Sequence, residues 1–250
     1  MLAVKNVKKS YQQGGVLSMK RKMILKDVSF QMNKGECLGI IGESGSGKST
    51  LGRLVLGIEK PDSGEILYMG KNVNNPNTRL GHMSTVFQDY SSSINPNACV
   101  FEAIAEPMMV IDRKYNHKRY EEKIIQLLED VGLNRSYLKK YPHELSGGEA
   151  QRVCIARAIS TEPQFLLLDE AISSLDVSIQ TQILNLFLKL KEKYKMSYLF
   201  ITHDIQAAVY ICDRIIFFND GKIIEETAVN NIGRVKDPYS RSLLAAVIPF

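Results

Sequence analysis

A loop rich in glycine and serine is predicted between a short apolar stretch and a helical pattern, and its residues are Gly42, Glu43, Ser44, Gly45, Ser46, Gly47, Lys48 and Ser49. Glycines let the backbone curl until several amide N–H groups point at one anion, and the following helix adds the positive end of its dipole. The spacing fits GxxxxGK followed by Ser or Thr, the pattern of a nucleotide phosphate loop. We therefore expect Lys48 to reach the β- and γ-phosphates, Ser49 to hold Mg²⁺, and Thr50 to belong to the same binding segment.

A pair of acids, Asp169 and Glu170, follows an apolar run at residues 165–168. Such a pair at the end of a strand is usually only a solvated corner, and alone it indicates little. Downstream of a phosphate loop, Asp169 can hold the Mg²⁺ shell and Glu170 can orient and polarise the attacking water. The two segments together predict an enzyme that hydrolyses ATP with Mg²⁺.

Strands and helices alternate around these chemical groups. Apolar runs predict strands at 37–41, 83–87, 165–168, 197–201 and 214–218, and helical spacing predicts helices at 49–57, 146–160, 179–194 and 205–211. Two further strands are expected near the amino terminus, at 24–32 and, as an edge strand, at 2–7, with a loop at 12–22 between them. This alternation is typical of an α/β fold with a parallel sheet covered on both faces.

A helical block interrupts the alternation after residue 88. Residues 89–97 are polar and rich in turn formers, and a helical pattern then runs from 100 to 133. We interpret residues 89–162 as a helical lobe inserted into a core made by 1–88 and 163–228. Residues 229–250 form a tail, so that all 250 residues make one domain.

Composition narrows the classes of protein. The chain is 44% hydrophobic and 24% charged, and its net charge of +5 is not gathered into a basic run, so no nucleic-acid partner is expected. Four cysteines are scattered without a CxxC pair, which favours free thiols in a reducing compartment over a zinc site. There is no signal-peptide pattern and no stretch near the roughly 18 apolar residues of a membrane span. We expect a cytosolic protein that meets a membrane only through a partner.

The segment LSGGEAQR at residues 145–152 resembles the LSGGQ signature of ABC ATPases, with Glu149 in place of the usual Gln. A capping serine and two glycines at a helix start can offer amide groups to a phosphate. The resemblance implies that Ser146, Gly147 and Gly148 bind the ATP held by an opposite subunit. Glu149 places a negative charge near that phosphate.

Other positions match the same family. Gln88 resembles the glutamine that senses Mg²⁺ and the membrane subunit, and residues 173–176 resemble the segment called the D-loop. His203, which follows an apolar strand, resembles the switch histidine that contacts the γ-phosphate. Tyr11 occupies the place of the aromatic residue that stacks on adenine, although a generic surface tyrosine is the competing interpretation.

The resemblance spans essentially the whole chain. It implies a P-loop NTPase (RecA-like) core with an antiparallel β subdomain at the amino terminus and an inserted α-helical subdomain. It also implies catalytic roles for Glu170, His203 and Gln88, and Mg²⁺ coordination by Ser49, Gln88 and Asp169. The implied partners are a second, homologous but different ATPase, with which this chain forms a heterodimer, two membrane permease subunits and, indirectly, an external solute-binding protein. The implied location is the cytoplasmic face of the membrane.

Segments outside the ATP machinery resemble the ATPases of peptide and nickel importers, and they lie at residues 88–96, 106–108 and 237–244. The sequence DEAISSLD at 169–176 departs from the DEPTSALD form of the peptide branch and is closer to the nickel-import ATPases. We therefore expect nickel import, with dipeptide or oligopeptide import and metal–metallophore import as alternatives. A groove near residues 88–106 should receive a short helix of the permease, and no residue of this chain is expected to touch the cargo.

Two other classes of ABC protein are weighed against an importer. Soluble ABC proteins of DNA repair or translation usually carry two cassettes or a long coiled coil, and this sequence shows neither. Exporter ATPases are often fused to membrane spans, which this sequence lacks, but separate exporter ATPases exist and stay an alternative.

Overall fold

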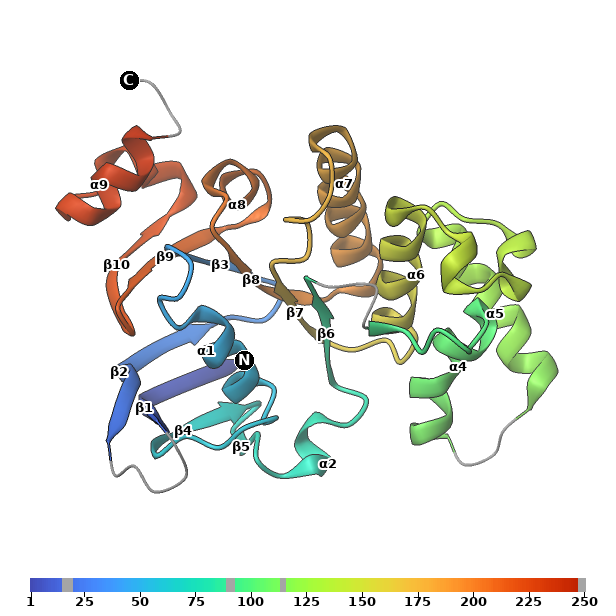
Figure 1. Ribbon diagram of the computed structural model, residues 1–250, viewed down its shortest axis with the longest axis horizontal. Coiled ribbons are helices and arrows are strands. Elements are labelled where there is room, and N and C mark those ends of the chain that lie inside the picture. The colour runs from blue at the N-terminus through green and yellow to red at the C-terminus, as the bar shows by residue number, and fades with distance from the viewer. Residues whose placement is uncertain (15–19, 89–92, 113–115, 247–250) are drawn as a thin grey trace. The chain divides into compact units, whose positions relative to one another are not determined.

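The computed structural model describes residues 1–14, 20–88, 93–112 and 116–246 (Figure 1). The chain divides into two compact units, one of Met1–Arg79 with Ser197–Phe250 and one of Leu80–Met196. Residues 89–92, which belong to the importer-like stretch at 88–96, lie outside the described residues. The predicted boundaries of the helical lobe, at 89 and 162, stay a prediction.

An antiparallel sheet in the first unit has the strand order β2-β1-β4-β5. Its strands are β1 (Leu2–Gln12), β2 (Arg21–Met32), β4 (Ser63–Tyr68) and β5 (Lys71–Asn72). The prediction of an edge strand at 2–7 was wrong, because β1 pairs with β2 on one side and with β4 on the other. Alternating hydrophobicity reports that one face of a strand is buried, but it does not report how many neighbours the strand has.

A second set of strands in the first unit runs in the order β10-β9-β3-β8. Their bounds are β3 (Cys37–Ile41), β8 (Ser197–Thr202), β9 (Arg214–Asn219) and β10 (Lys222–Ala228), and the helices of this unit are α1 (Lys48–Val55), α2 (Pro76–Arg79), α8 (Ile205–Ile211) and α9 (Pro238–Ala245), with a 3₁₀ helix η3 (Val229–Arg234). β3 pairs in parallel with β8 and β9, and every residue of β3 and of β8 is buried. Burial on both faces explains why these strands are continuous apolar runs rather than alternating ones.

Helix α9 lies within the segment that the sequence indicated only as a tail. Pro238 stands at its first position, and the side chain of Asp237 accepts a hydrogen bond from Tyr239 N at 2.8 Å. An Asp cap followed by proline is a recognised helix start, so the signal for α9 was present in the sequence.

The second unit combines two parallel strands with helices. Its elements are β6 (Met83–Phe87), β7 (Phe165–Asp169), α4 (Val100–Ile111), α5 (His117–Asp130), α6 (Gly147–Ile159) and α7 (Val177–Tyr194), with 3₁₀ helices η1 (Arg135–Lys139) and η2 (Pro142–Glu144). β6 pairs with β7, α4 packs against α5 and α6, and Ile104, Ile124 and Val153 on these three helices are fully buried.

The single helical pattern expected from 100 to 133 is two helices. α4 ends at Ile111, and α5 starts after Asn116, whose side chain accepts a hydrogen bond from Arg119 N at 3.1 Å. Hydrophobic periodicity alone predicted one helix, because it does not show that Asn116 caps the start of a second one. Among the described residues no helix is both long and apolar enough to cross a membrane.

Candidate active site

The phosphate loop leaves the carboxyl end of β3 and leads directly into α1. Gly45 and Gly47 have φ of +79° and +108°, a region that favours glycine. Gly42 is needed for a different reason, because a Cβ atom on it would lie 1.9 Å from the carbonyl oxygen of Phe218 in β9. The start of the loop is therefore pressed against the backbone of a strand that comes much later in the chain.

The turn between β9 and β10 holds the other side of the loop. Gly221 N donates to Ser46 O at 2.9 Å, and Lys26 N donates to Gly221 O at 2.8 Å. A Cβ on Gly221 would lie 2.1 Å from Ile24 O, so this turn also touches β2 closely. The hairpin thus connects the phosphate loop to the antiparallel sheet, a role that the sequence did not indicate.

The loop is suited to an anionic ligand. Lys48 Nζ donates to Gly42 O at 2.7 Å and to Glu43 O at 2.8 Å, and the whole residue is only 4% exposed. Ser46 Oγ is buried and has no hydrogen-bond partner among the described residues, which costs about 1–3 kcal/mol unless a ligand supplies one. No acidic residue occupies the first turn of α1, so the positive end of its dipole is not neutralised there. These features fit the phosphates of ATP with Mg²⁺.

Tyr11 is tied to α1 by a polar cluster. Its hydroxyl donates to Glu59 Oε2 at 2.5 Å and accepts from Arg53 Nη2 at 3.4 Å. Arg53 also donates to Thr50 Oγ1 at 3.2 Å and pairs with Glu59 at 2.6 Å. Tyr11 is therefore fixed to the helix that follows the phosphate loop, although its stacking on adenine stays a prediction.

His203 leaves the sheet beside the phosphate loop. In the parallel pair of β3 and β8, Ile41 is opposite Thr202, so Gly42 and His203 follow neighbouring strand ends. Asp204 then caps α8 by accepting from Ala207 N at 3.1 Å. The histidine is held between a buried strand and a capped helix, which fixes its backbone.

Gln88 and Glu170 are neighbours within the second unit in the same way. Phe87 is opposite Asp169 in the pair of β6 and β7, so both predicted residues follow adjacent strand ends. Asp169 is 8% exposed, and Glu170 has a φ of 53°, which is unusual for a residue other than glycine. The arrangement places Gln88 and Asp169, two of the three predicted metal ligands, and the predicted general base Glu170 at one end of this strand pair, whereas the third, Ser49, belongs to α1 of the first unit.

Two glutamines hold the segment that resembles the D-loop. Gln151 of α6, which is 1% exposed, donates to Ala171 O at 2.6 Å. Gln180 of α7 donates to Leu175 O at 2.9 Å, and Ser174 Oγ donates to Gln88 O at 3.4 Å. Sequence reasoning did not give Gln151 or Gln180 a role, and an amide side chain has no local pattern that would reveal a partner 20 residues away.

Glu149 completes a capping box at the start of α6. Ser146 is the N-cap, and the Glu149 carboxylate accepts from Ser146 N at 2.8 Å and from Ser146 Oγ at 2.9 Å. The hydroxyl of Tyr137 also donates to this carboxylate. The hydrogen bond from Tyr137 and those from Ser146 lower the pKa of Glu149 to about 2. The departure from the signature therefore places an ionised carboxylate on the Ser146 hydroxyl, which the resemblance predicts to bind phosphate.

A family profile described as "ABC transporter" matches residues 25–173, which is more than half of the chain. The chain belongs to the ABC transporter family. It is 48% identical to the metal-staphylopine import system ATP-binding protein of Staphylococcus aureus over 250 residues, covering 100% of both chains. It is 41% identical to an oligopeptide transport ATP-binding protein of Bacillus subtilis over 228 residues, covering 88% of this chain and 75% of that protein.

A solved structure of a dimeric bacterial ABC transporter cassette also resembles this protein. The TM-score is 0.82 at 29% sequence identity, with 92% of this chain and 99% of that chain covered. The likeness confirms the predicted fold class, an α/β cassette with an antiparallel β part and a helical part. The protein is an ABC-type ATPase that uses ATP and Mg²⁺, as predicted, whereas the roles of single residues stay predictions.

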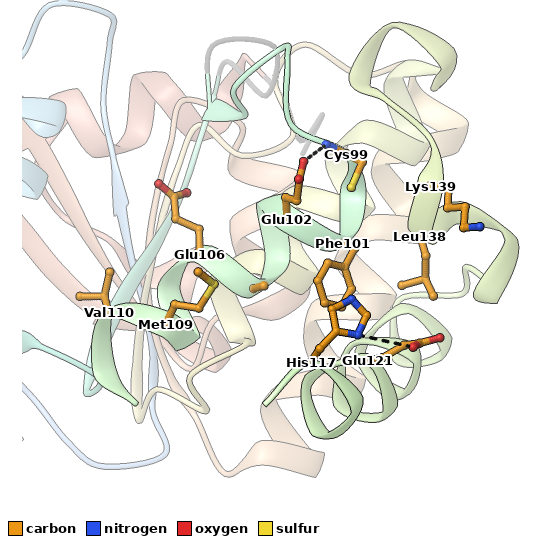
Figure 2. Close-up of a pocket in the computed structure, with 11 residues that line it drawn as sticks. Cys99, Phe101, Glu102, Glu106, Met109, Val110, His117, Glu121, Leu138 and Lys139 are labelled. Atoms are coloured by element: carbon orange, nitrogen blue, oxygen red, sulfur yellow. Dashed lines mark hydrogen bonds and ion pairs between the residues drawn. The ribbon is translucent and has the colours of Figure 1, made fainter. Parts of the chain in front are cut away.

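This ABC cassette has a groove of about 810 Å³ on its helical unit, drawn in Figure 2. Apolar side chains of α4 form one wall, including Phe101, Met109 and Val110, and Leu138 contributes from η1. The ring of Phe101 stacks on His117 with 4.8 Å between centroids (Figure 2). Met109 and Val110 are 47% and 60% exposed, and exposed apolar side chains beside a hollow with an apolar wall indicate a binding surface.

The Glu149 cluster predicts a pH dependence. A carboxyl whose pKa is about 2 in the folded chain, against 4.5 as the reference value, stabilises the fold fully above pH 4.5. That contribution is lost as the pH falls through about 2. A carbon-13 NMR titration of the Glu149 side chain should show the low pKa, and Tyr137→Phe should raise it because the largest cause is removed. An unchanged titration in Tyr137→Phe would show that this hydrogen bond does not control the carboxylate.

Proposed function

We propose that this chain is the ATP-hydrolysing subunit of an ABC importer for metal–metallophore complexes. The observation that carries the proposal is the 48% identity, over the full length of both chains, to an ATP-binding protein of a metal-staphylopine importer. The sequence favoured nickel import, but the relatives described above are named for metal-staphylopine and oligopeptide import, so they support the alternatives better. Oligopeptide import is the second candidate, favoured by the 41% identity to an oligopeptide transport protein.

In the proposed mechanism, the phosphate loop binds ATP through its amides and through Lys48. Ser49, Gln88 and Asp169 are the residues that would hold Mg²⁺, which when bound would supply positive charge beside the phosphates. Glu170 orients the attacking water and polarises it. His203 contacts the γ-phosphate.

A second, homologous cassette completes each site in this proposal. Ser146, Gly147 and Gly148 stand at the amino end of α6, where the helix dipole favours an anion from another molecule, although the amide and hydroxyl of Ser146 already donate to Glu149. The similar cassette of known structure is described as dimeric, which supports pairing of cassettes. The proposal includes a heterodimer, as the resemblance implied, so the partner cassette is a different gene product. Closing the pair excludes water from the reacting phosphate.

The groove on the helical unit is the proposed binding site for a short helix of the permease. Its wall at Cys99, Phe101 and Glu106 lies in or next to the region 88–106 that the sequence indicated for this contact. The charges at this surface are mixed, because Lys139 also lines the groove, Glu121 pairs with Arg135 at 2.6 Å and Glu106 pairs with Arg157 at 2.8 Å. The apolar face of an amphipathic helix would match the apolar wall of the groove. The proposed location is therefore the cytoplasmic face of the membrane, reached through two permease subunits and supplied by an external solute-binding protein.

An uptake assay tests the proposal. A strain that lacks this gene should lose import of a labelled metal–metallophore complex and should regain it when the wild-type gene returns. Import of the free nickel salt and of a labelled oligopeptide should be unchanged. Loss of oligopeptide uptake alone would transfer the assignment to the second candidate, and a defect in efflux would indicate an exporter.

A groove variant tests the coupling in the same strain. Val110→Glu places a charge on a groove residue that is 60% exposed, so uptake should fall while ATP hydrolysis by the purified protein persists. Ile58→Glu is the matched control, because Ile58 is a 55% exposed aliphatic residue that does not line the groove. Equal uptake in both variants would remove the groove from the proposed permease contact.

A further inference from the structure

Helix α9 reaches the phosphate loop through one tyrosine. Tyr239 Oη accepts a hydrogen bond from Glu43 N at 3.2 Å and lies 3.4 Å from Phe218 O, to which it donates. The two residues joined to the tyrosine belong to the phosphate loop and to β9. A single phenol therefore bridges the loop and the strand against which Gly42 is pressed.

The tyrosine is held in place by the way α9 begins. The carboxylate of Glu225 in β10 accepts from Lys236 N at 2.8 Å and from Asp237 N at 3.1 Å. Asp237 in turn caps the helix at Tyr239 N, and Leu244 near the other end is buried. Both ends of α9 are thus fixed to the first unit, so the direction of the Tyr239 side chain is set by the fold.

The hydrogen bond acts on a peptide group that also holds the loop lysine. Glu43 N and Gly42 O are the two polar atoms of one peptide group. Tyr239 binds the N–H side, and Lys48 Nζ donates to the carbonyl side at 2.7 Å. Because a peptide group is planar, fixing the N–H also fixes the direction of the carbonyl. Hydrogen bonds on both sides of one peptide also polarise each other.

We propose that Tyr239 is a positioning residue for the ATPase, which orients the Gly42–Glu43 peptide and thereby places Lys48 for the phosphates of ATP. Without the hydroxyl, this peptide loses the restraint on its N–H side, so the carbonyl that accepts from Lys48 is held less firmly, while the second hydrogen bond of Lys48, to Glu43 O at 2.8 Å, remains. Burial of the phenol raises its pKa, so the hydroxyl keeps its proton and stays a donor to Phe218 O at neutral pH. The inference needs only the ATPase activity and the phosphate role of Lys48, and it holds for any cargo.

The test is Tyr239→Phe, which keeps the ring and removes only the hydroxyl. We expect the Kd for ATP and the KM for ATP to rise about 3- to 10-fold, the range for one lost hydrogen bond, with a smaller change in kcat. Amide hydrogen exchange at Glu43 should accelerate in the folded variant, which a merely packing role of the ring would not produce. The control is Ser242→Ala, since Ser242 is exposed on the same helix and its hydroxyl donates to Tyr239 O at 2.8 Å.

Each outcome decides the proposal. An unchanged Kd and unchanged Glu43 exchange in Tyr239→Phe would overturn it, and so would an equal rise in Ser242→Ala, because the effect would then come from α9 as a whole. A Lys48→Ala variant separates the two assumptions. If Lys48→Ala loses ATP binding while Tyr239→Phe does not, only the role of Tyr239 fails. If Lys48→Ala binds ATP normally, the phosphate role of Lys48 fails, and the proposal with it.

Discussion

Replacing Glu170 by glutamine is expected to lower the ATP turnover number by about 100-fold or more, the usual contribution of a general base, while ATP stays bound. The amide keeps the shape of the carboxylate but cannot polarise the attacking water or take its proton. Glu170 directly follows the buried end of β7, next to the Asp169 that is predicted to hold Mg²⁺. Steady-state phosphate release and retention of radiolabelled ATP measure the two quantities separately.

Glu162→Gln is the matched control for that experiment. Glu162 lies in the same unit, has a φ of 52° against 53° for Glu170, and pairs with Lys123 at 2.7 Å on the surface. The backbone strain and the charge change are therefore alike in the two variants. Turnover should stay near the wild-type value in Glu162→Gln, and unchanged turnover in Glu170→Gln would show that another group activates the water.

Replacing Gly42 by alanine is expected to lower the affinity for ATP by about 100-fold or to abolish binding. The added Cβ would meet the carbonyl oxygen of Phe218 at 1.9 Å, so either β9 or the loop must shift. Overpacking of this kind costs about 1–3 kcal/mol in the free energy of unfolding, and here the strain falls on the loop itself. Isothermal titration with ATP and urea denaturation measure the loss of affinity and of stability.

Gly35→Ala is the control that separates the effect of a steric clash from the effect of backbone strain. Gly35 has a φ of +77°, but a Cβ there would meet no atom within 4 Å. The variant should lose about 1–2 kcal/mol of unfolding free energy through the left-handed conformation alone, and it should bind ATP normally. If Gly42→Ala binds ATP as well as Gly35→Ala does, the contact between the loop and β9 is not essential.

Several parts of the first unit contact the phosphate loop of this cassette. The hairpin of β9 and β10 holds Ser46 through Gly221, and α9 holds Glu43 through Tyr239. Both supports come from the last quarter of the chain. A change in the position of α9 or of this hairpin would therefore reach the nucleotide without passing through the helical unit.

Residues next to each other in the chain carried most of what the sequence predicted. The phosphate loop at 42–49 needs a fixed order of glycines, lysine and serine, so its chemistry is visible without a structure. Buried strands such as β3 and β7 were found because burial on both faces requires an unbroken apolar run. The cap at Ser146 was visible for a similar reason, since the capping box spans only four residues.

Contacts between distant residues could not be predicted in this way. The periodicity of β1 was correct, but its second neighbour, β4, could not be inferred from it, and the edge-strand prediction failed. Tyr239 and Glu43 are 196 positions apart, and no local pattern connects a phenol to one particular amide. Local resemblance could not predict the cargo for a related reason, since no residue of this chain is expected to touch it.

The sequence by itself determined that this protein is an ABC ATPase, because the segments predicted to bind phosphate and activate water, and the segment that resembles the ABC signature, are short and ordered. Only the tertiary structure decided what holds those segments in place. Gly42 is pressed against Phe218, and Tyr239 binds the peptide group whose carbonyl accepts a hydrogen bond from Lys48. The physical reason is that every residue except proline carries the same backbone donor and acceptor. The partner of such a group therefore depends on the packing of the fold and not on the neighbouring residues in the sequence.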